Sequence, residues 1–186
     1  MKSKGYVGSI IRVDLTHRKV EVRKMDDETA RMYIGGTGLA AKILWDNTDA
    51  ATDPLGPDNH ICFFTGPCTG TPVPTSGRLG IAAISPLTGI WGESSLGGFW
   101  GVELKRAGYD GLVVSGEADR PVYIFIHDEK IEVRSAEHLW GEDTWVLDER
   151  LKQETHPGAR SLGIGMAGEN KVPFASIQSG GRLGRS

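Results

Sequence analysis

The sequence predicts an α+β protein with largely antiparallel β-sheet. Segments that alternate apolar and polar residues outnumber helical patterns by about two to one. They follow one another mostly as adjacent hairpins, without regular alternation of strand and helix. Glycine makes up 26 of the 186 residues, roughly twice the usual share, and gathers in short clusters between apolar runs, as the turns between short strands require.

Length and composition predict one globular domain over residues 1–186. The chain is 39% hydrophobic and 24% charged, which suits a soluble protein with a real core. A net charge of -3 argues against nucleic acid or an anionic membrane as partner. No apolar run is long enough to cross a membrane, and the amino terminus lacks a signal-peptide pattern, so we expect a cytoplasmic protein.

The first quarter of the chain predicts a hairpin followed by two helices. Residues 5–15 and 19–25 alternate apolar and polar side chains around a short turn. Residues 26–36 begin with acidic side chains and end with two glycines, the order a short helix prefers. Thr37 can then cap a second helix over 38–47, with its apolar side chains on one face.

The middle of the chain predicts strands separated by irregular segments. Turn residues fill 53–59, and the apolar run 60–66 indicates a buried strand. Two closely spaced prolines exclude regular structure from 70–77, and 78–85 is again a strand. A glycine- and serine-rich loop at 92–98 precedes the next predicted elements, a helix over 99–107 and a strand over 111–116.

The last third predicts a hairpin, a helix and two more strands. Residues 121–136 alternate on both sides of a polar turn at 127–130. A helix over 143–155 has Asp143 or Thr144 as its cap. Strands are expected within 160–168 and within 172–180, ahead of the terminal GGRLGRS.

The two cysteines, Cys62 and Cys68, are expected to be ordinary buried thiols. A disulfide between them is disfavoured in a reducing compartment, and two thiolates cannot complete a four-cysteine metal site. The histidines are scattered without metal-binding spacing. No dinucleotide-binding glycine motif and no P-loop occurs, so those nucleotide sites are disfavoured.

The segment 92–98 allows two interpretations. Serine before a helix is an ordinary cap, and on composition this reading is favoured. Alternatively, Ser94, Ser95 and the glycines present unpaired backbone N–H groups to a bound anion such as phosphate. The neighbouring Trp91 and Trp100 are expected to pack rather than to take part in chemistry.

Arginines beside glycine occur in two further places. Arg78 opens a strand after the proline-rich segment, and Arg182 and Arg185 lie in the terminal GGRLGRS. Taken singly, each arginine is explained by solvent exposure. Taken together with 92–98, the arginines could converge on one large anionic ligand, because the planar guanidinium group binds phosphate and similar anions through two N–H groups. Acid–base candidates are poor, because no nucleophile elbow or Ser/His/Asp grouping occurs. A cofactor or another segment would have to supply the reactive atom.

Collinear blocks of the sequence carry a family resemblance. They include IGGTGLAAKILWD, DPLGPDNHICFFTGP, SGRLGIAAISPLTG, GESSLGGFWGVELKRAGYDGLVVSG, IGMAGENKVPFASI and GRLGR. From about residue 5 to the last residue, the chain resembles the amino-terminal domain of the tungsten-containing aldehyde:ferredoxin oxidoreductase family. This resemblance implies two mainly antiparallel β-sheets that form a saddle, with a few short helices, under a bis-pterin cofactor carrying tungsten or molybdenum.

The resemblance also implies a cofactor site on three loops. By motif these contain Arg78, then Ser95, Leu96, Gly97 and Gly98, then Arg182, Leu183, Gly184 and Arg185. The backbone carbonyls of Ser95 and Arg182 would hold a magnesium ion that bridges the two pterin phosphates. Many family members have asparagine at the position of Ser95, an exchange that a backbone ligand tolerates, and a small residue at the position of Arg182.

Family enzymes also contain two helical domains, which carry a 4Fe-4S cluster and the acid–base residues. These domains have no counterpart in the 186 residues, so the chain by itself is expected to be inactive. The whole enzyme would oxidise aldehydes to carboxylic acids and pass electrons to ferredoxin or another low-potential carrier, with a homodimer as a possible assembly. SLGGFWGVELK also resembles the benzoyl-CoA reductase-type branch. A non-catalytic scaffold that kept the fold is the remaining alternative.

Overall fold

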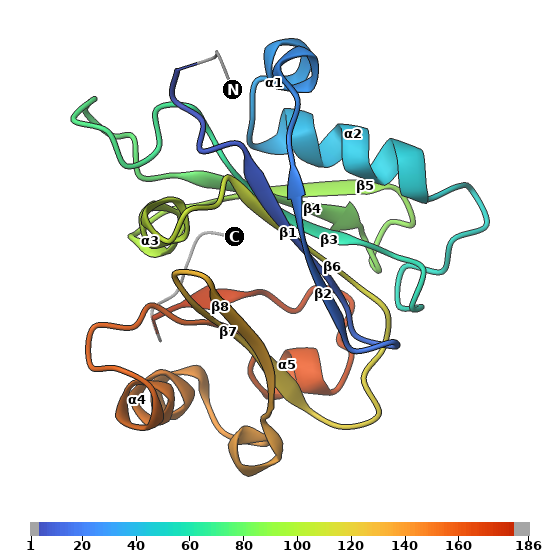
Figure 1. The fold of residues 1–186 in the computed structure, drawn as a ribbon. Coiled ribbons are helices and arrows are strands. Elements are labelled where there is room, and N and C mark those ends of the chain that lie inside the picture. The colour runs from blue at the N-terminus through green and yellow to red at the C-terminus, as the bar shows by residue number, and fades with distance from the viewer. Residues whose placement is uncertain (1–3, 181–186) are drawn as a thin grey trace.

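A computed structural model describes residues 4–180, and it confirms the α+β class (Figure 1). The strands are β1 Ser9–Asp14, β2 Lys19–Lys24, β3 Ile61–Thr65, β4 Leu79–Ile84, β5 Trp91–Leu96, β6 Gly111–Ser115, β7 Val122–His127, β8 Lys130–Ser135, β9 Leu162–Gly163 and β10 Gln178–Ser179. The helices are α1 Asp27–Tyr33, α2 Thr37–Asn47, α3 Trp100–Arg106, α4 Thr144–Glu154 and α5 Met166–Glu169, with a short 3₁₀ helix at Glu137–Leu139. Within the described residues, no helix has the length and apolar character needed to cross a membrane.

One large sheet organises the fold. Its strand order is β2-β1-β6-β3-β4-β5, and its neighbours are antiparallel except for the parallel pair β1 and β6. The parallel pair arises because the chain, after making the edge strand β5, returns through α3 and inserts β6 between β1 and β3. The hairpin β7-β8 and the short pair β9-β10 form two separate two-stranded sheets.

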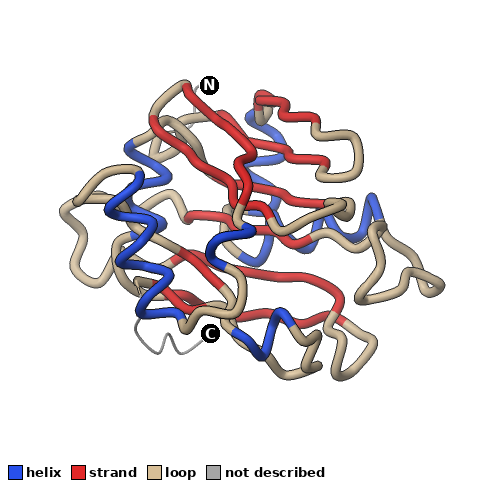
Figure 2. Tube along the Cα trace, turned by 90° about the horizontal axis from the view of Figure 1, so that it is seen from below, coloured by secondary structure: helices blue, strands red, loops and turns tan. Residues whose placement is uncertain are grey.

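Different elements cover the two faces of the large sheet. Helices α1 and α2 lie against one face, and α3 and the β7-β8 hairpin lie against the other (Figures 1 and 2). Because side chains alternate along a strand, the four central strands β1, β6, β3 and β4 contribute to both cores. Phe64 and Leu39 belong to the core under α1 and α2, whereas Ile11, Leu96 and Leu104 belong to the core under α3.

A buried carboxylate ties the chain together at one end of this sheet. Asp110, fully buried at the start of β6, accepts hydrogen bonds from the backbone N–H groups of Gly8 (2.6 Å) and Val7 (3.2 Å). Its backbone carbonyl accepts from both the N–H and the hydroxyl of Thr65, each at 2.9 Å. The ammonium group of Lys105 lies 3.6 Å from the Asp110 carboxylate. Burial lowers the pKa of Lys105, and Asp110 opposes that shift.

The helix caps separate correct from incorrect predictions. Asp143 caps α4 by accepting from two backbone N–H groups, as predicted. The predicted cap Thr37 is wrong, because Thr37 is already the first helical residue and Gly36 precedes it in a backbone conformation with φ of 53°. Glycine adopts this conformation without the penalty that a Cβ atom brings, so backbone freedom rather than a side-chain hydrogen bond begins α2.

Two other predictions need correction. The strands expected within 160–168 and 172–180 shrink to the two-residue pair β9 and β10, because α5 occupies Met166–Glu169 between them. Cys62 is buried within β3 as predicted, but Cys68 is exposed, because it follows Pro67 in the turn after that strand. Trp100 packs into the core against Phe63, with ring centroids 5.8 Å apart, whereas Trp91 is 40% exposed.

The substitution Asp110→Asn tests the buried carboxylate. The N–H groups of Val7 and Gly8 donate to different carboxylate oxygens, so an amide would place its NH2 group against one of these donors and leave Lys105 without its counter-charge. We expect the free energy of unfolding, measured by urea denaturation, to fall by about 3 kcal/mol. The exposed control Glu103→Gln on α3 should change it by less than about 0.5 kcal/mol. Equal effects of the two substitutions would contradict a special role for Asp110.

The two cysteines should behave differently. Burial raises the pKa of the Cys62 thiol to about 12, from 9.0 in the absence of burial. Above about pH 9 the unfolded chain loses this proton while the folded chain keeps it, so rising pH favours unfolding. Between pH 8 and pH 10, the free energy of unfolding of the wild-type chain should fall by about 1.4 kcal/mol more than that of Cys62→Ala. Iodoacetamide should alkylate only Cys68 in the native chain; rapid modification of Cys62 would contradict its burial.

Candidate functional site

Arg78 and Ser95 meet at one end of the sheet. Arg78 immediately precedes β4, and Ser95 pairs with Gly80 in the antiparallel register of β4 and β5. The Arg78 guanidinium donates from Nη1 to the Ser95 backbone carbonyl at 2.9 Å and to the Ser95 hydroxyl at 3.3 Å. Both residues are exposed. The structure therefore joins two of the three segments that the sequence predicted would converge.

Ser95 reaches this position in a strand, not in the predicted loop. Residues 91–96 form the edge strand β5, which hydrogen-bonds to β4 along its whole length. The serines are therefore not helix caps: α3 follows Phe99, which makes no side-chain capping bond. A segment rich in glycine and serine does not resemble a strand in sequence, so β5 was predicted as a loop. Pairing with β4 stabilises it as a strand.

The turn after β5 presents open backbone beside Arg78. Gly98 has φ of +89°, a conformation that favours glycine, and a Cβ atom added at Gly97 would meet no atom within 4 Å. Gly77 runs alongside, since a Cβ added there would lie 3.1 Å from the Gly98 carbonyl oxygen. Leu96, also predicted for the site, is fully buried in the core, so only its backbone can face a ligand.

The third predicted segment begins beside the same turn. A Cβ atom added at Gly98 would lie 3.8 Å from the Ser179 hydroxyl, on β10. Ser179, which directly precedes GGRLGRS in the sequence, therefore lies next to Gly98. The predicted ligand residues of that segment lie outside the described residues; they are Arg182, Leu183, Gly184 and Arg185.

Arg160 is a second cation near this turn, which sequence reasoning missed. Its guanidinium carbon lies 5.2 Å from the ring centroid of Phe99, which directly follows Gly98 and is 62% exposed. A contact at this distance fits a cation–π interaction. Because Arg160 is 61 positions beyond Phe99 in the sequence, no local pattern could have indicated the pair.

The arrangement suits anion binding better than proton transfer. An exposed guanidinium, a serine hydroxyl and unobstructed glycine backbone surround one turn, the donors that phosphate groups accept from. Among residues 4–180, no three His, Cys, Asp or Glu side chains gather into a group that could hold a metal ion. The residues present therefore fit a phosphate-bearing cofactor and offer no metal-ligating side-chain cluster of their own.

Comparison with known proteins identifies related sequences. The family model for "Aldehyde ferredoxin oxidoreductase, N-terminal domain" matches residues 10–186. A tungsten-containing aldehyde ferredoxin oxidoreductase from Pyrococcus furiosus is 42% identical over 178 residues, and one from Thermococcus kodakarensis is 41% identical over 180 residues. Each alignment covers 95% of this chain and 29% of the relative, so the chain spans less than a third of these proteins.

A solved structure shares the fold closely. It is described as the active site complex BamBC of benzoyl coenzyme A reductase in complex with 1,5-dienoyl-CoA. The match has a TM-score of 0.93 and 38% sequence identity, and covers 95% of this chain and 27% of the solved chain.

The neighbouring glycines of the turn provide a matched pair of substitutions. Gly98→Ala forces a Cβ atom onto backbone with φ of +89°, so the free energy of unfolding should fall by about 1–2 kcal/mol. Gly97→Ala places its methyl group in open space and should change stability by less than about 0.5 kcal/mol. Urea denaturation of both variants measures the difference. A larger loss for Gly97→Ala than for Gly98→Ala would refute this description of the turn.

Proposed function

The chain belongs to the aldehyde ferredoxin oxidoreductase family, of which it carries the amino-terminal domain, and on this premise we propose that it binds the phosphates of a tungsten or molybdenum bis-pterin cofactor. The contact of Arg78 with Ser95 beside the open turn Gly97–Gly98 is the observation that supports this most. It gives a phosphate both a fixed cation and backbone that a bulky ligand can approach.

Each side of the proposed site has a distinct task. The Arg78 guanidinium would neutralise phosphate charge, and without the cofactor it donates to the carbonyl and hydroxyl oxygens of Ser95. Gly97 and Gly98 leave room for the pterin. Arg182 and Arg185 would add charge from the terminal segment, with Leu183 and Gly184 as backbone neighbours. Arg160 raises the positive potential nearby.

The hydrogen bond from Arg78 to the Ser95 carbonyl bears directly on the proposed magnesium ion. We propose that it bridges the two phosphates, held by the backbone carbonyls of Ser95 and Arg182. In the structure the Ser95 carbonyl already accepts a hydrogen bond from Arg78. A carbonyl oxygen has a second lone pair, but a guanidinium repels a cation. Magnesium binding would therefore require Arg78 to turn from the carbonyl toward a phosphate oxygen.

The activity of the whole protein follows from the relatives, as a further part of the proposal. When bound, the metal would supply the two-electron change by which an aldehyde and water become a carboxylic acid and two protons. The two electrons would leave singly, through a 4Fe-4S cluster in the remaining domains, to ferredoxin or another low-potential carrier. The present chain contributes by holding and orienting the cofactor. We propose that it does not turn over substrate alone, and that the whole protein can form a homodimer.

A reaction of the benzoyl-CoA reductase type is the second candidate. The match to the BamBC structure, at a TM-score of 0.93 and 38% identity, is nearly as strong in sequence as that to the aldehyde enzymes. We propose that both candidate reactions use the same phosphate site. They differ in the substrate, because the names of the two relatives give different substrates. A scaffold without cofactor would need no such site, and metal content separates it from both enzymes.

Cofactor content tests the proposal. The full-length protein, purified from cells supplied with tungstate, should contain tungsten or molybdenum with about two pterins per metal, measured by mass spectrometry of metals and by pterin fluorescence. Arg78→Gln removes one charge-assisted contact and should lower retained pterin about tenfold. Gly97→Ala should also lower pterin content while leaving the free energy of unfolding unchanged, because its methyl group enters the open space.

The control variant changes an arginine outside the proposed site. Arg106→Gln, on the exposed surface of α3, removes the same charge away from the turn and should leave pterin content unchanged. Wild-type protein with neither tungsten nor molybdenum would refute the proposal, as would full pterin retention by Arg78→Gln. A panel of aldehydes and acyl-CoA thioesters then decides between the two candidate reactions.

A further inference from the structure

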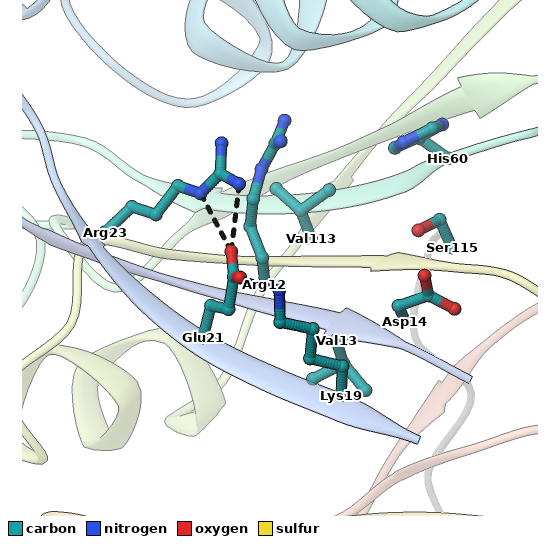
Figure 3. A pocket seen from close by; sticks show the side chains of 9 residues that line it. All are labelled: Arg12, Val13, Asp14, Lys19, Glu21, Arg23, His60, Val113 and Ser115. Atoms are coloured by element: carbon teal, nitrogen blue, oxygen red, sulfur yellow. Dashed lines mark hydrogen bonds and ion pairs between the residues drawn. The ribbon is translucent and has the colours of Figure 1, made fainter. Parts of the chain in front are cut away.

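A second charged pocket lies on the β2-β1-β6 side of the large sheet, away from β4 and β5. It has a volume of about 170 Å³ and is lined by Arg12, Val13, Asp14, Lys19, Glu21, Arg23, His60, Val113 and Ser115 (Figure 3). Asp14 and Ser115 end β1 and β6, whereas Ser9 and Gly111 at the other ends of these strands lie beside Asp110. Arg23, which also lines the pocket, pairs with Ile10 near the Asp110 end of β1, so the pocket runs along the face of β2, β1 and β6. Strand β3 lies between these strands and β4 and β5, where Arg78 and Ser95 meet.

Strand register places the charged side chains of the pocket on one face. Arg12 pairs with Glu21 across β1 and β2, so Lys19 and Arg23, two positions to either side, are its diagonal neighbours on the same face. Val113 lines the pocket and also belongs to the core under α1 and α2. The pocket thus opens on the face that α2 covers in part.

Arg12 forms no ion pair within 4 Å among the described residues, although the carboxylates of Glu21 and Asp46 act on it from farther away. Its cross-strand partner Glu21 is held instead by its own strand, forming ion pairs with Lys19 and with Arg23, the latter at 2.9 Å. Figure 3 shows the Glu21 carboxylate bonded to Arg23, with the Arg12 guanidinium alongside but unbonded. Asp14, the other carboxylate of the pocket, accepts from the backbone and ring of His17 at 3.0 and 2.7 Å.

The electrostatics of the pocket favour an added negative charge. Three cations, Arg12, Lys19 and Arg23, face two carboxylates, which leaves an excess of one positive charge. Burial lowers the pKa of Arg12, the nearby Arg23 lowers it further, and Cys62, Glu21 and Asp46 oppose this shift. Burial also lowers the pKa of His60, at the pocket's edge. A bound anion would relieve the repulsion between the two guanidinium groups.

We propose that this pocket binds a small oxyanion, a phosphate or carboxylate group, between the guanidinium groups of Arg12 and Arg23. Lys19 lies on the same face and adds a third cation, and the Ser115 hydroxyl at the far rim can donate a hydrogen bond. Guanidinium forks match both ligand groups in geometry. The site is distinct from the proposed cofactor loops, and its existence does not depend on the proposed function.

Titration calorimetry at low ionic strength tests the site, using inorganic phosphate in one arm and acetate in the other. Arg12→Gln should weaken binding of the preferred anion about tenfold. Glu21→Gln should strengthen it severalfold, because it frees Lys19 and Arg23 from their shared carboxylate. Arg106→Gln, on α3 across the sheet, is the charge-matched control and should leave affinity unchanged.

The opposite effects of Arg12→Gln and Glu21→Gln separate this site from non-specific attraction. Tighter phosphate binding would identify a phosphoryl ligand, and tighter acetate binding would identify a carboxylate; either supports the proposal. Backbone NMR shifts should localise the anion at Val113 and Ser115. Absence of binding in both arms would overturn the proposal, as would equal weakening by Arg12→Gln and Arg106→Gln. Thermal unfolding of each variant confirms folding, and Glu21→Gln keeps the test valid if Arg12→Gln does not fold.

Discussion

The buried carboxylate of Asp110 is the interaction on which the candidate site depends. It joins the residues before β1, the end of β3 and the start of β6 at one point, which fixes where the inserted strand β6 begins. Lys105, beside it, donates to the Gly66 carbonyl at 2.6 Å, and Gly66 in turn donates to the Thr69 hydroxyl at 3.0 Å. Thr69 then donates to the Arg78 carbonyl at 3.0 Å. Contiguous hydrogen bonds therefore run from the core to the arginine of the proposed cofactor site.

Charged side chains are arranged differently at the Asp110 end of the sheet and in the pocket on β2, β1 and β6. At the Asp110 end, the buried charges are satisfied by hydrogen bonds, and the exposed guanidinium of Arg78 donates to Ser95. On the β2-β1-β6 side, the carboxylate that faces Arg12 is shared by its neighbours, so Arg12 forms no ion pair within 4 Å among residues 4–180. An unsatisfied cation costs stability, and this cost is what a bound anion would offset.

The sequence revealed most of the strands and much of the site, but not how they meet. The alternation of apolar and polar residues correctly predicted the β1-β2 and β7-β8 hairpins, because consecutive residues of a strand point to opposite faces. It missed β5, where a glycine- and serine-rich edge strand depends on pairing with β4. Arg78 and Ser95 were identified separately, and only the register of two strands shows that they touch. No local pattern indicates the role of Asp110, because its hydrogen-bond partners lie more than 40 residues away.

The central claim is that Arg78 and the turn after β5 hold the phosphates of a bis-pterin cofactor. The most direct measurement is a crystal structure of the metal-loaded, full-length protein. It should show a pterin phosphate oxygen within about 3.2 Å of the Arg78 guanidinium, with the pterin lying over the open backbone at Gly97. Phosphates held elsewhere, with Arg78 still bonded only to Ser95, would contradict the claim.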